Sequence, residues 1–172
     1  MDKLSHQLDS ANKTPMRLSF LFILLVCIGL LSYAQYLQHV KGLLPCPLCV
    51  AQRLAYWSLA LTAFVALLHN PKSFGRHLYS LLIVIFAFMG TIIAARHAWL
   101  IRYPESFECG ISPEEALLNS LPIANWWPGM FEANGDCANV DWTFLSLTIP
   151  DWSLSVFVGL GILALYPLLT RR

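Results

Sequence analysis

Four of the five cysteines in this 172-residue chain form a pattern that could carry out redox chemistry. Cys46 and Cys49 form the motif Cys-Pro-Leu-Cys, and Cys109 and Cys137 follow later in the chain. A Cys-x-x-Cys bridge closes too short a loop to restrict the unfolded chain much, so it is a poor structural staple. The spacing favours thiols that exchange disulfides by thiolate attack.

Three interpretations of these four cysteines compete. They could form two structural disulfides, a zinc site of four thiolates, or two redox-active pairs. Only one pair has the close spacing of zinc ligands, so we predict no metal site. Redox exchange fits the spacing, the number and the predicted sidedness of the cysteines best. The remaining cysteine, Cys27, lies within an apolar stretch, where a small buried structural residue is expected.

The residues around Cys46 favour a reactive pair. Pro47 suits the first position of a helix, which predicts that a helix begins at the motif. Unpaired backbone N–H groups and the helix dipole would then lower the pKa of both thiols. Arg53 is one helical turn below Cys49, where a permanent cation would stabilise a thiolate. The alternative for Arg53 is an interfacial side chain that reaches toward lipid headgroups.

Net oxidation also needs an electron acceptor. The chain has no G-x-G-x-x-G motif for a dinucleotide, and Val50 stands where a covalent haem motif needs histidine. A lipid-soluble quinone is the acceptor available at the membrane surface. His97 is expected at the same level and could hydrogen-bond a quinone carbonyl, although an ordinary interfacial histidine is equally compatible with the sequence.

The elements that must position these residues are apolar helices. The chain is 57% hydrophobic and 12% charged, and residues 18–40, 54–71, 77–95 and 152–170 contain no Asp, Glu, Lys or Arg. Each stretch is long enough to approach or cross the hydrocarbon core of a bilayer as a helix. We therefore predict one all-α membrane domain over residues 1–172, a bundle of four transmembrane helices. Its spans are 18–37, 50–69, 78–98 and 152–170.

Charge distribution predicts the orientation of this bundle. Seven of the eleven cations fall in the two tails and the connection between the second and third spans. Cytoplasmic segments carry the excess of Lys and Arg, so both termini are predicted to be cytoplasmic, with loops 38–49 and 99–151 outside. A cleaved signal peptide is the competing interpretation of the first stretch, which runs longer than such a peptide needs. The net charge of +1 excludes nucleic-acid binding through net charge.

The long outer loop is expected to form short helices on the membrane. Ser112-Pro113-Glu114-Glu115 has capping-box spacing, and Pro122 and Pro128 prevent one long helix. Trp126, Trp127, Met130 and Phe131 suit a segment that lies on the bilayer. We expect this arm to be anchored there while Cys137 moves between Cys109 and Cys46; the alternative is a rigid loop packed on the bundle. Gly159 and Gly161 are expected to serve helix packing.

Taken together, these motifs resemble the DsbB family, the disulfide bond formation proteins of bacterial inner membranes. The resemblance covers nearly the whole chain, and the ordered set is far more specific than a lone Cys-x-x-Cys. The matching positions are Gln38-His39-Val40, Pro45-Cys46-Pro47-Leu48-Cys49, Arg53, His97, Leu100, Tyr103-Pro104, Cys109, Gly135-Asp136-Cys137-Ala138, Trp142, Phe144-Leu145, Pro150, Trp152 and Phe157.

The resemblance implies an inner-membrane enzyme that reoxidises DsbA, a periplasmic thioredoxin-like dithiol oxidase, and passes the electrons to ubiquinone or menaquinone. By position, Cys109 would form the mixed disulfide with the DsbA-like partner. Cys137 would pair with Cys109 and then bond Cys46.

The resemblance further implies that Cys49 is the thiolate facing the quinone, with Arg53 and His97 at the quinone site. Gln52 departs from the pattern, because some members have an acid there. Two other functions compete. A vitamin K epoxide reductase-like enzyme would carry its motif near the end of the fourth span, where residues 152–170 have no cysteine. A structural membrane protein would hold two inert disulfides.

Overall fold

The computed structural model describes residues 2–42, 45–71, 73–103, 113–133, 137 and 143–169. Its long helices are α1 (Asp2–Lys41), α2 (Pro47–His69), α3 (Ser73–Arg102) and α7 (Ile149–Leu169). Three short helices lie between α3 and α7: α4 (Pro113–Asn119), α5 (Pro122–Trp126) and α6 (Pro128–Phe131). A hairpin of β1 (Thr143–Phe144) and β2 (Leu147–Thr148) precedes α7.

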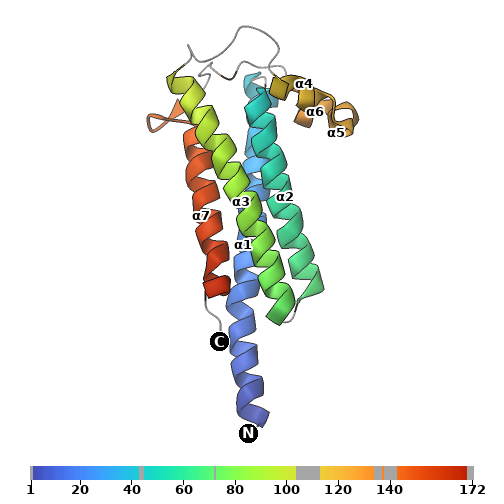
Figure 1. The fold of residues 1–172 in the computed structure, drawn as a ribbon, viewed down its shortest axis with the longest axis vertical. Helices are drawn as coiled ribbons and strands as arrows, with labels where there is room; N and C mark the ends of the chain where they lie inside the picture. The colour runs from blue at the N-terminus through green and yellow to red at the C-terminus, as the bar shows by residue number, and fades with distance from the viewer. Residues whose placement is uncertain are drawn as a thin grey trace.

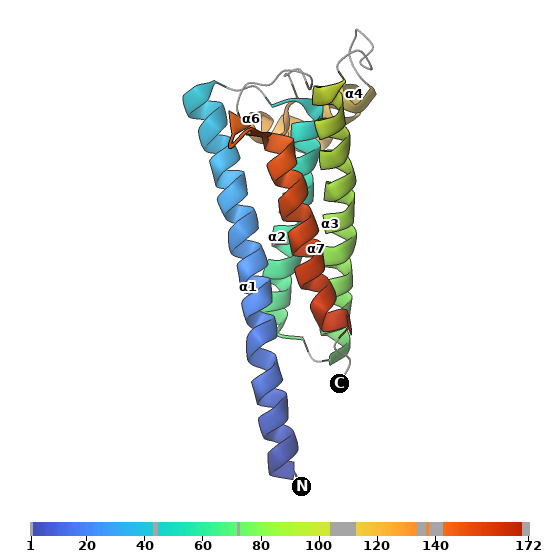
Figure 2. The ribbon, with the colours of Figure 1, turned by 90° about the vertical axis from the view of Figure 1, so that its left-hand side faces the viewer.

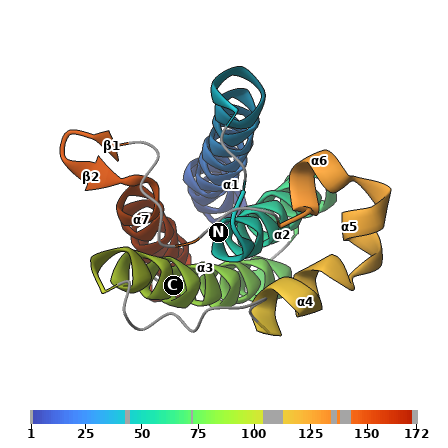
Figure 3. The same cartoon turned by 90° about the horizontal axis from the view of Figure 1, so that it is seen from above.

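The four long helices lie side by side as a bundle (Figure 1). Viewed along the bundle, α2 lies between α1 and α3, and α7 packs mainly on α3 (Figure 3). The start of α1 and the end of α7 lie at one end of the bundle, and α4–α6 lie at the other (Figure 2). This arrangement puts the first residues of α2 and the last turns of α3 at the same end as the short helices.

Small residues allow the helices to approach closely. Alanines occupy the buried face of α2 at Ala60, Ala63 and Ala66, and large side chains fill the spaces between helices. Tyr56 and Phe157 stack with ring centroids 4.2 Å apart, which joins α2 to α7. Cys27 is fully buried in α1, as the sequence predicted for a structural cysteine.

Helices α1, α2 and α3 contain segments long and apolar enough to cross a membrane, namely Arg17–Lys41, Pro47–His69 and Phe74–Arg102. Within the described part of α7, the apolar segment Ile149–Leu165 is shorter. All four helices nonetheless expose large apolar side chains away from the bundle, as lipid-facing helices do. These include Phe22, Leu25, Leu61, Phe64, Phe88, Ile92, Val158 and Ile162. The protein is thus a mostly helical membrane protein, and a fourth span remains a prediction.

The short helices follow the prolines. Pro122 and Pro128 each begin a new helix, which confirms that they prevent one long helix. The proposed capping residue Ser112 lies outside the described residues. Met130 and Phe131 are buried against the bundle, so the prediction that they lie on the membrane is wrong. Trp126, which is 93% exposed, and Trp127 do face outward.

The hairpin is a small departure from an all-α chain. Leu145 and Ser146 form its turn with φ of 53° and 63°, a left-handed conformation that non-glycine residues rarely adopt. The Asp151 carboxylate accepts hydrogen bonds from the backbone N–H and hydroxyl of Thr148 at the start of α7. It also pairs with Arg102 at 2.8 Å, which links the end of α3 to the start of α7.

Candidate redox site

The Cys-x-x-Cys motif forms the N-terminus of α2, as predicted. Cys46 is the N-cap, with extended backbone angles, and Pro47 occupies the first helical position. The Cys46 sulfur accepts a hydrogen bond from the backbone N–H of Cys49 at 3.2 Å. The Cys46 thiol donates a hydrogen bond to Cys49 Sγ across 3.0 Å. The helix end therefore holds two sulfurs in contact, poised to form or break one bond.

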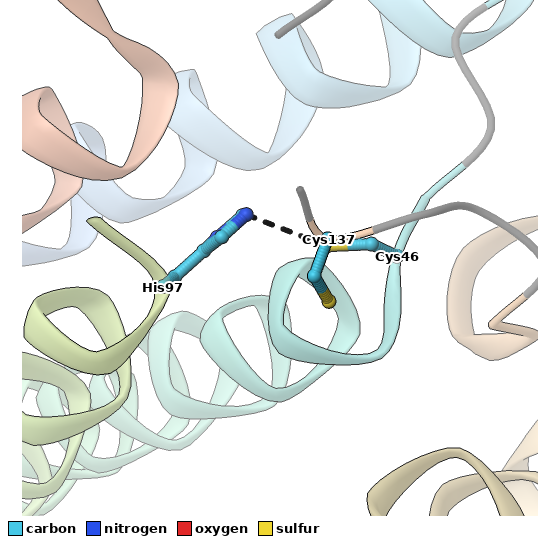
Figure 4. Close-up of side chains that lie close together, drawn as sticks. All are labelled: Cys46, His97 and Cys137. Atoms are coloured by element: carbon cyan, nitrogen blue, oxygen red, sulfur yellow. Dashed lines mark hydrogen bonds between the residues drawn. The ribbon is translucent and has the colours of Figure 1, made fainter. Parts of the chain in front are cut away.

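Cys137 lies beside this pair. It is 3% exposed and packs with Cys46 and Leu48. The sulfurs of Cys46 and Cys137 and a ring nitrogen of His97 all lie within 4.8 Å of one another. His97 points from α3 toward Cys46, with Cys137 beside them (Figure 4). Packing thus brings together residues from three distant parts of the chain, while Cys109 lies outside the described residues.

The pKa of the Cys46 thiol shifts in the opposite direction from the one that the sequence predicted. Hydrogen bonds with Cys137 and Cys49, together with burial, raise the pKa of the Cys46 thiol. The prediction that the helix terminus lowers the pKa is therefore wrong for Cys46, because the helix dipole is outweighed by desolvation and by neighbouring thiols. The Cys46 thiol is therefore favoured in its protonated form, as a hydrogen-bond donor to Cys49 Sγ.

Arg53 lies in the interior, at 8% exposed, rather than reaching toward the headgroups. Its Nη1 donates to the Gln38 side-chain oxygen at 2.8 Å and to the Met130 carbonyl at 3.0 Å. Gln38 Nε2 in turn donates to the Gly129 carbonyl at 2.8 Å. The guanidinium also interacts electrostatically with Cys49 and Cys46. Arg53 therefore places a cation near both thiols and joins α1, α2 and α6.

His97 is buried at 4% exposed, with both ring nitrogens facing protein groups. Its Nε2 lies 3.6 Å from Cys46 Sγ, and its Nδ1 lies 3.2 Å from Gln52 Nε2. The histidine thus belongs to the thiol cluster rather than to an exposed helix end. Its proposed contact with a quinone remains a prediction.

Two glutamines of the site were missed by sequence reasoning. Gln38 was noted only within a matching motif, and Gln52 only as a departure from it. No spacing rule points to either residue, since each acts through a partner distant in sequence. One signal was available: both are amides within or beside predicted membrane spans, where buried polar groups must find hydrogen bonds.

Two sulfurs and an imidazole nitrogen are also chemically suitable ligands for zinc. A metal there would occupy Cys46 and Cys137, the two sulfurs that the predicted disulfide exchange would use. The sequence-based expectation of no metal site therefore remains the working prediction.

Comparison with known proteins decides the family. Residues 16–167 match the family model of the disulfide bond formation protein DsbB. The chain belongs to the DsbB family. A disulfide bond formation protein B from Nitrosomonas eutropha is 61% identical over 87% of this chain and 92% of its own length. Those from Nitrosomonas europaea and Nitrosospira multiformis are 60% and 59% identical, covering 87% and 92% of this chain and 91% and 94% of their own lengths.

Membership in the DsbB family supports an oxidoreductase role in disulfide bond formation in a membrane. It agrees with the resemblance drawn from the motifs. It also favours redox-active cysteines over inert disulfides, and DsbB over the vitamin K epoxide reductase-like alternative.

Proposed function

We propose that this protein is a thiol oxidoreductase of the bacterial inner membrane that reoxidises a periplasmic DsbA-like oxidase and passes the electrons to a membrane quinone. The observation that carries the proposal is the position of Cys46. Its sulfur contacts Cys49 Sγ and lies within 4.8 Å of Cys137 Sγ. Cys46 Sγ could therefore exchange a bond with Cys49 for a bond with Cys137 with little movement.

The proposed relay consists of balanced disulfide exchanges. A partner thiolate attacks Cys109 of a Cys109–Cys137 disulfide, and Cys137 leaves as a thiolate. Cys137 then attacks Cys46 of a Cys46–Cys49 disulfide, so that the Cys46–Cys137 bond forms and Cys49 leaves with the electron pair. The second partner thiol releases oxidised partner from Cys109. Cys109 next attacks Cys137 and frees Cys46.

The residues near Cys49 are chemically suited to a quinone. Both hydrogen bonds of Arg53 start at Nη1, so within the described residues its Nη2 and Nε donors have no protein acceptor. These donors, beside a half-buried Cys49, suit a carbonyl oxygen that gains negative charge. A bound ubiquinone or menaquinone would supply a two-electron acceptor. Arg53 would hold its carbonyl oxygen, and His97 would lie beside the site with its ring nitrogens directed at Gln52 and Cys46.

The proposed topology places α7 as a fourth span and the Cys-x-x-Cys end of the bundle in the periplasm. Exposed apolar residues on α7 support the span, and the inner cations support the orientation. DsbA is a soluble periplasmic oxidase, so the outer loop would have to lie in the periplasm to reach it.

The deciding experiment is anaerobic mixing of purified protein, reduced DsbA-like oxidase and ubiquinone, with quinone absorbance recorded over time. We expect one quinone reduced for each partner dithiol oxidised, and loss of the reaction in Cys46→Ser. No quinone reduction by the intact protein, or full steady-state activity of Cys46→Ser, would refute the relay.

A further inference from the structure

The ring of His97 is fixed at both nitrogens by buried groups. Gln52, 4% exposed, places its amide nitrogen 3.2 Å from Nδ1, and Cys46 Sγ lies 3.6 Å from Nε2. Gln52 follows Cys49 by less than one turn on α2, whereas His97 is on α3. The contact therefore locks the angle of the imidazole relative to the motif.

The contact with Gln52 also determines the tautomer. An amide nitrogen only donates hydrogen bonds, so the Nδ1 atom that faces it must be the acceptor. In a neutral imidazole the proton then resides on Nε2. This nitrogen lies 3.6 Å from Cys46 Sγ (Figure 4), and the ring also hydrogen-bonds the Cys137 backbone.

The Cys46 sulfur requires such a donor at one step of the relay. When Cys46 leaves as a thiolate, its charge forms at a site that is 3% exposed. A buried anion is costly unless hydrogen-bond donors surround it. The backbone N–H of Cys49 supplies one donor at 3.2 Å. The Arg53 cation adds a favourable charge nearby, but its printed hydrogen bonds go to Gln38 and Met130 rather than to Cys46.

We propose that neutral His97 donates from Nε2–H to Cys46 and stabilises the leaving thiolate, and that Gln52 is the positioning residue that sets this tautomer. The inference rests on the proposed function. At the step concerned, the Cys109 thiolate attacks Cys137, the Cys109–Cys137 bond forms, and the Cys46–Cys137 bond breaks. Cys46 leaves with the electron pair, and no proton or net electron is transferred.

An acid in place of Gln52 would accept from Nδ1–H, and its charge would also favour the imidazolium, in which both ring nitrogens carry protons. Gln52→Glu therefore does not isolate the tautomer. Gln52→Met removes the hydrogen bond while keeping the shape.

The test follows the Cys46–Cys137 disulfide without quinone. Oxidised protein is mixed with reduced DsbA-like oxidase, quenched in acid, alkylated and mapped by mass spectrometry. We expect this disulfide to decay about tenfold or more slowly in His97→Ala, the effect of losing one hydrogen bond to a charged group. His97→Gln should decay near the wild-type rate, because its amide N–H can replace Nε2–H.

A double-mutant comparison isolates the role of Gln52. Gln52→Met should slow the decay in the wild-type background and have no further effect when combined with His97→Ala. The matched control is His69→Ala, an exposed histidine at the far end of α2. It should leave the decay unchanged.

Two outcomes would overturn the inference: wild-type decay in His97→Ala, or decay in His97→Gln as slow as in His97→Ala. Additive effects of Gln52→Met and His97→Ala would overturn the positioning role. These failures differ from failure of the proposed function, in which the wild-type protein would form no Cys46–Cys137 disulfide at all.

Discussion

Arg53 has two roles: it brings a positive charge near the thiols, and it joins neighbouring elements by hydrogen bonds. Its Nη1 serves two acceptors on two elements, and the cation lies close to the motif thiols. A lysine keeps the charge but has no planar fork with several fixed donors. The exact guanidinium geometry, more than the charge alone, should therefore matter for the acceptor side of the reaction.

We predict that Arg53→Lys lowers quinone reduction by about tenfold or more, since a buried charged group loses hydrogen bonds. Formation of the Cys46–Cys137 disulfide should change much less, because lysine keeps a positive charge near the leaving Cys49 thiolate. Stopped-flow quinone absorbance and disulfide mapping separate the two. Arg102→Lys is the matched control: Arg102 is 56% exposed and pairs with Asp151 at the surface. Equal losses in both variants would contradict the prediction.

Cys27 provides the contrast among the cysteines. It is fully buried in the apolar core of α1, away from the thiol cluster. We predict that Cys27→Ala and Cys27→Ser keep full quinone reduction. Oxidation of the partner should instead be abolished by replacement of any one of the other four cysteines, Cys46, Cys49, Cys109 and Cys137. Turnover assays of the purified variants test this. Loss of turnover in a well-folded Cys27→Ala protein would assign that thiol a role.

At the scale of elements, the closest described glycine contact is between α3 and α7. A Cβ on Gly90 would lie 2.5 Å from the ring of Phe157. That ring is fully buried and stacked on Tyr56, so it cannot move aside cheaply. The sequence pointed to Gly159 and Gly161 instead. Gly159 has open space, so that prediction is wrong, whereas a Cβ on Gly161 would make ordinary contact with Ala87.

We predict that Gly90→Ala destabilises the protein by about 1–3 kcal/mol through overpacking. Gly159→Ala should have no such cost, because nothing lies within 4 Å of its added Cβ. Thermal unfolding of both variants in detergent makes the comparison. Equal unfolding temperatures would show that α7 can shift away from α3 without loss.

The side-chain amide of Asn119 holds the arm, the segment that contains α4, α5 and α6, by two hydrogen bonds. Asn119 Nδ2 donates to the Ala133 carbonyl at 3.2 Å, and the Ala133 N–H donates to Asn119 Oδ1 at 3.0 Å. This pair joins the end of α4 to the segment that precedes Cys137. With α6 held by Gln38 and Arg53, the arm is packed on the bundle at this end; movement of Cys137 remains a prediction.

We predict that Asn119→Ala loosens this segment by about 2 kcal/mol, roughly 1 kcal/mol for each lost hydrogen bond. The observable effects are faster proteolysis of the arm and slower formation of the Cys46–Cys137 disulfide. Ser120→Ala, which removes an exposed hydroxyl that donates to the Leu117 carbonyl, is the control. Unchanged proteolysis in Asn119→Ala would contradict the prediction.

For the whole molecule, the question is which end of the bundle faces the periplasm. In a background without native cysteines, we predict that an impermeant maleimide labels Ser120→Cys in intact spheroplasts, and labels Phe74→Cys only after permeabilisation. Both positions are exposed, Ser120 on the arm and Phe74 at the other end of the bundle. Labelling of Phe74→Cys in intact spheroplasts would reverse the proposed orientation.

The sequence by itself determined the features that depend on local spacing. The uncharged stretches predicted long apolar helices, Pro47 marked the start of α2 at the motif, and a one-turn spacing put Arg53 near Cys49. Such features need only helix geometry and the cost of burying charge, which act within a few residues. Because the redox motif and the apolar stretches are local features of this kind, the sequence predicted a membrane thiol oxidoreductase without any tertiary contact.

Only the tertiary structure decided which distant groups meet. It placed Cys137 and His97 at Cys46, joined Gln52 to His97 and Gln38 to Arg53, and pressed Gly90 against Phe157. It also buried Met130 and Phe131 and raised the pKa of Cys46 against the helix dipole. These outcomes depend on burial and on partners 15 or more residues away, which no periodicity encodes. They arise when the helices and the arm pack together.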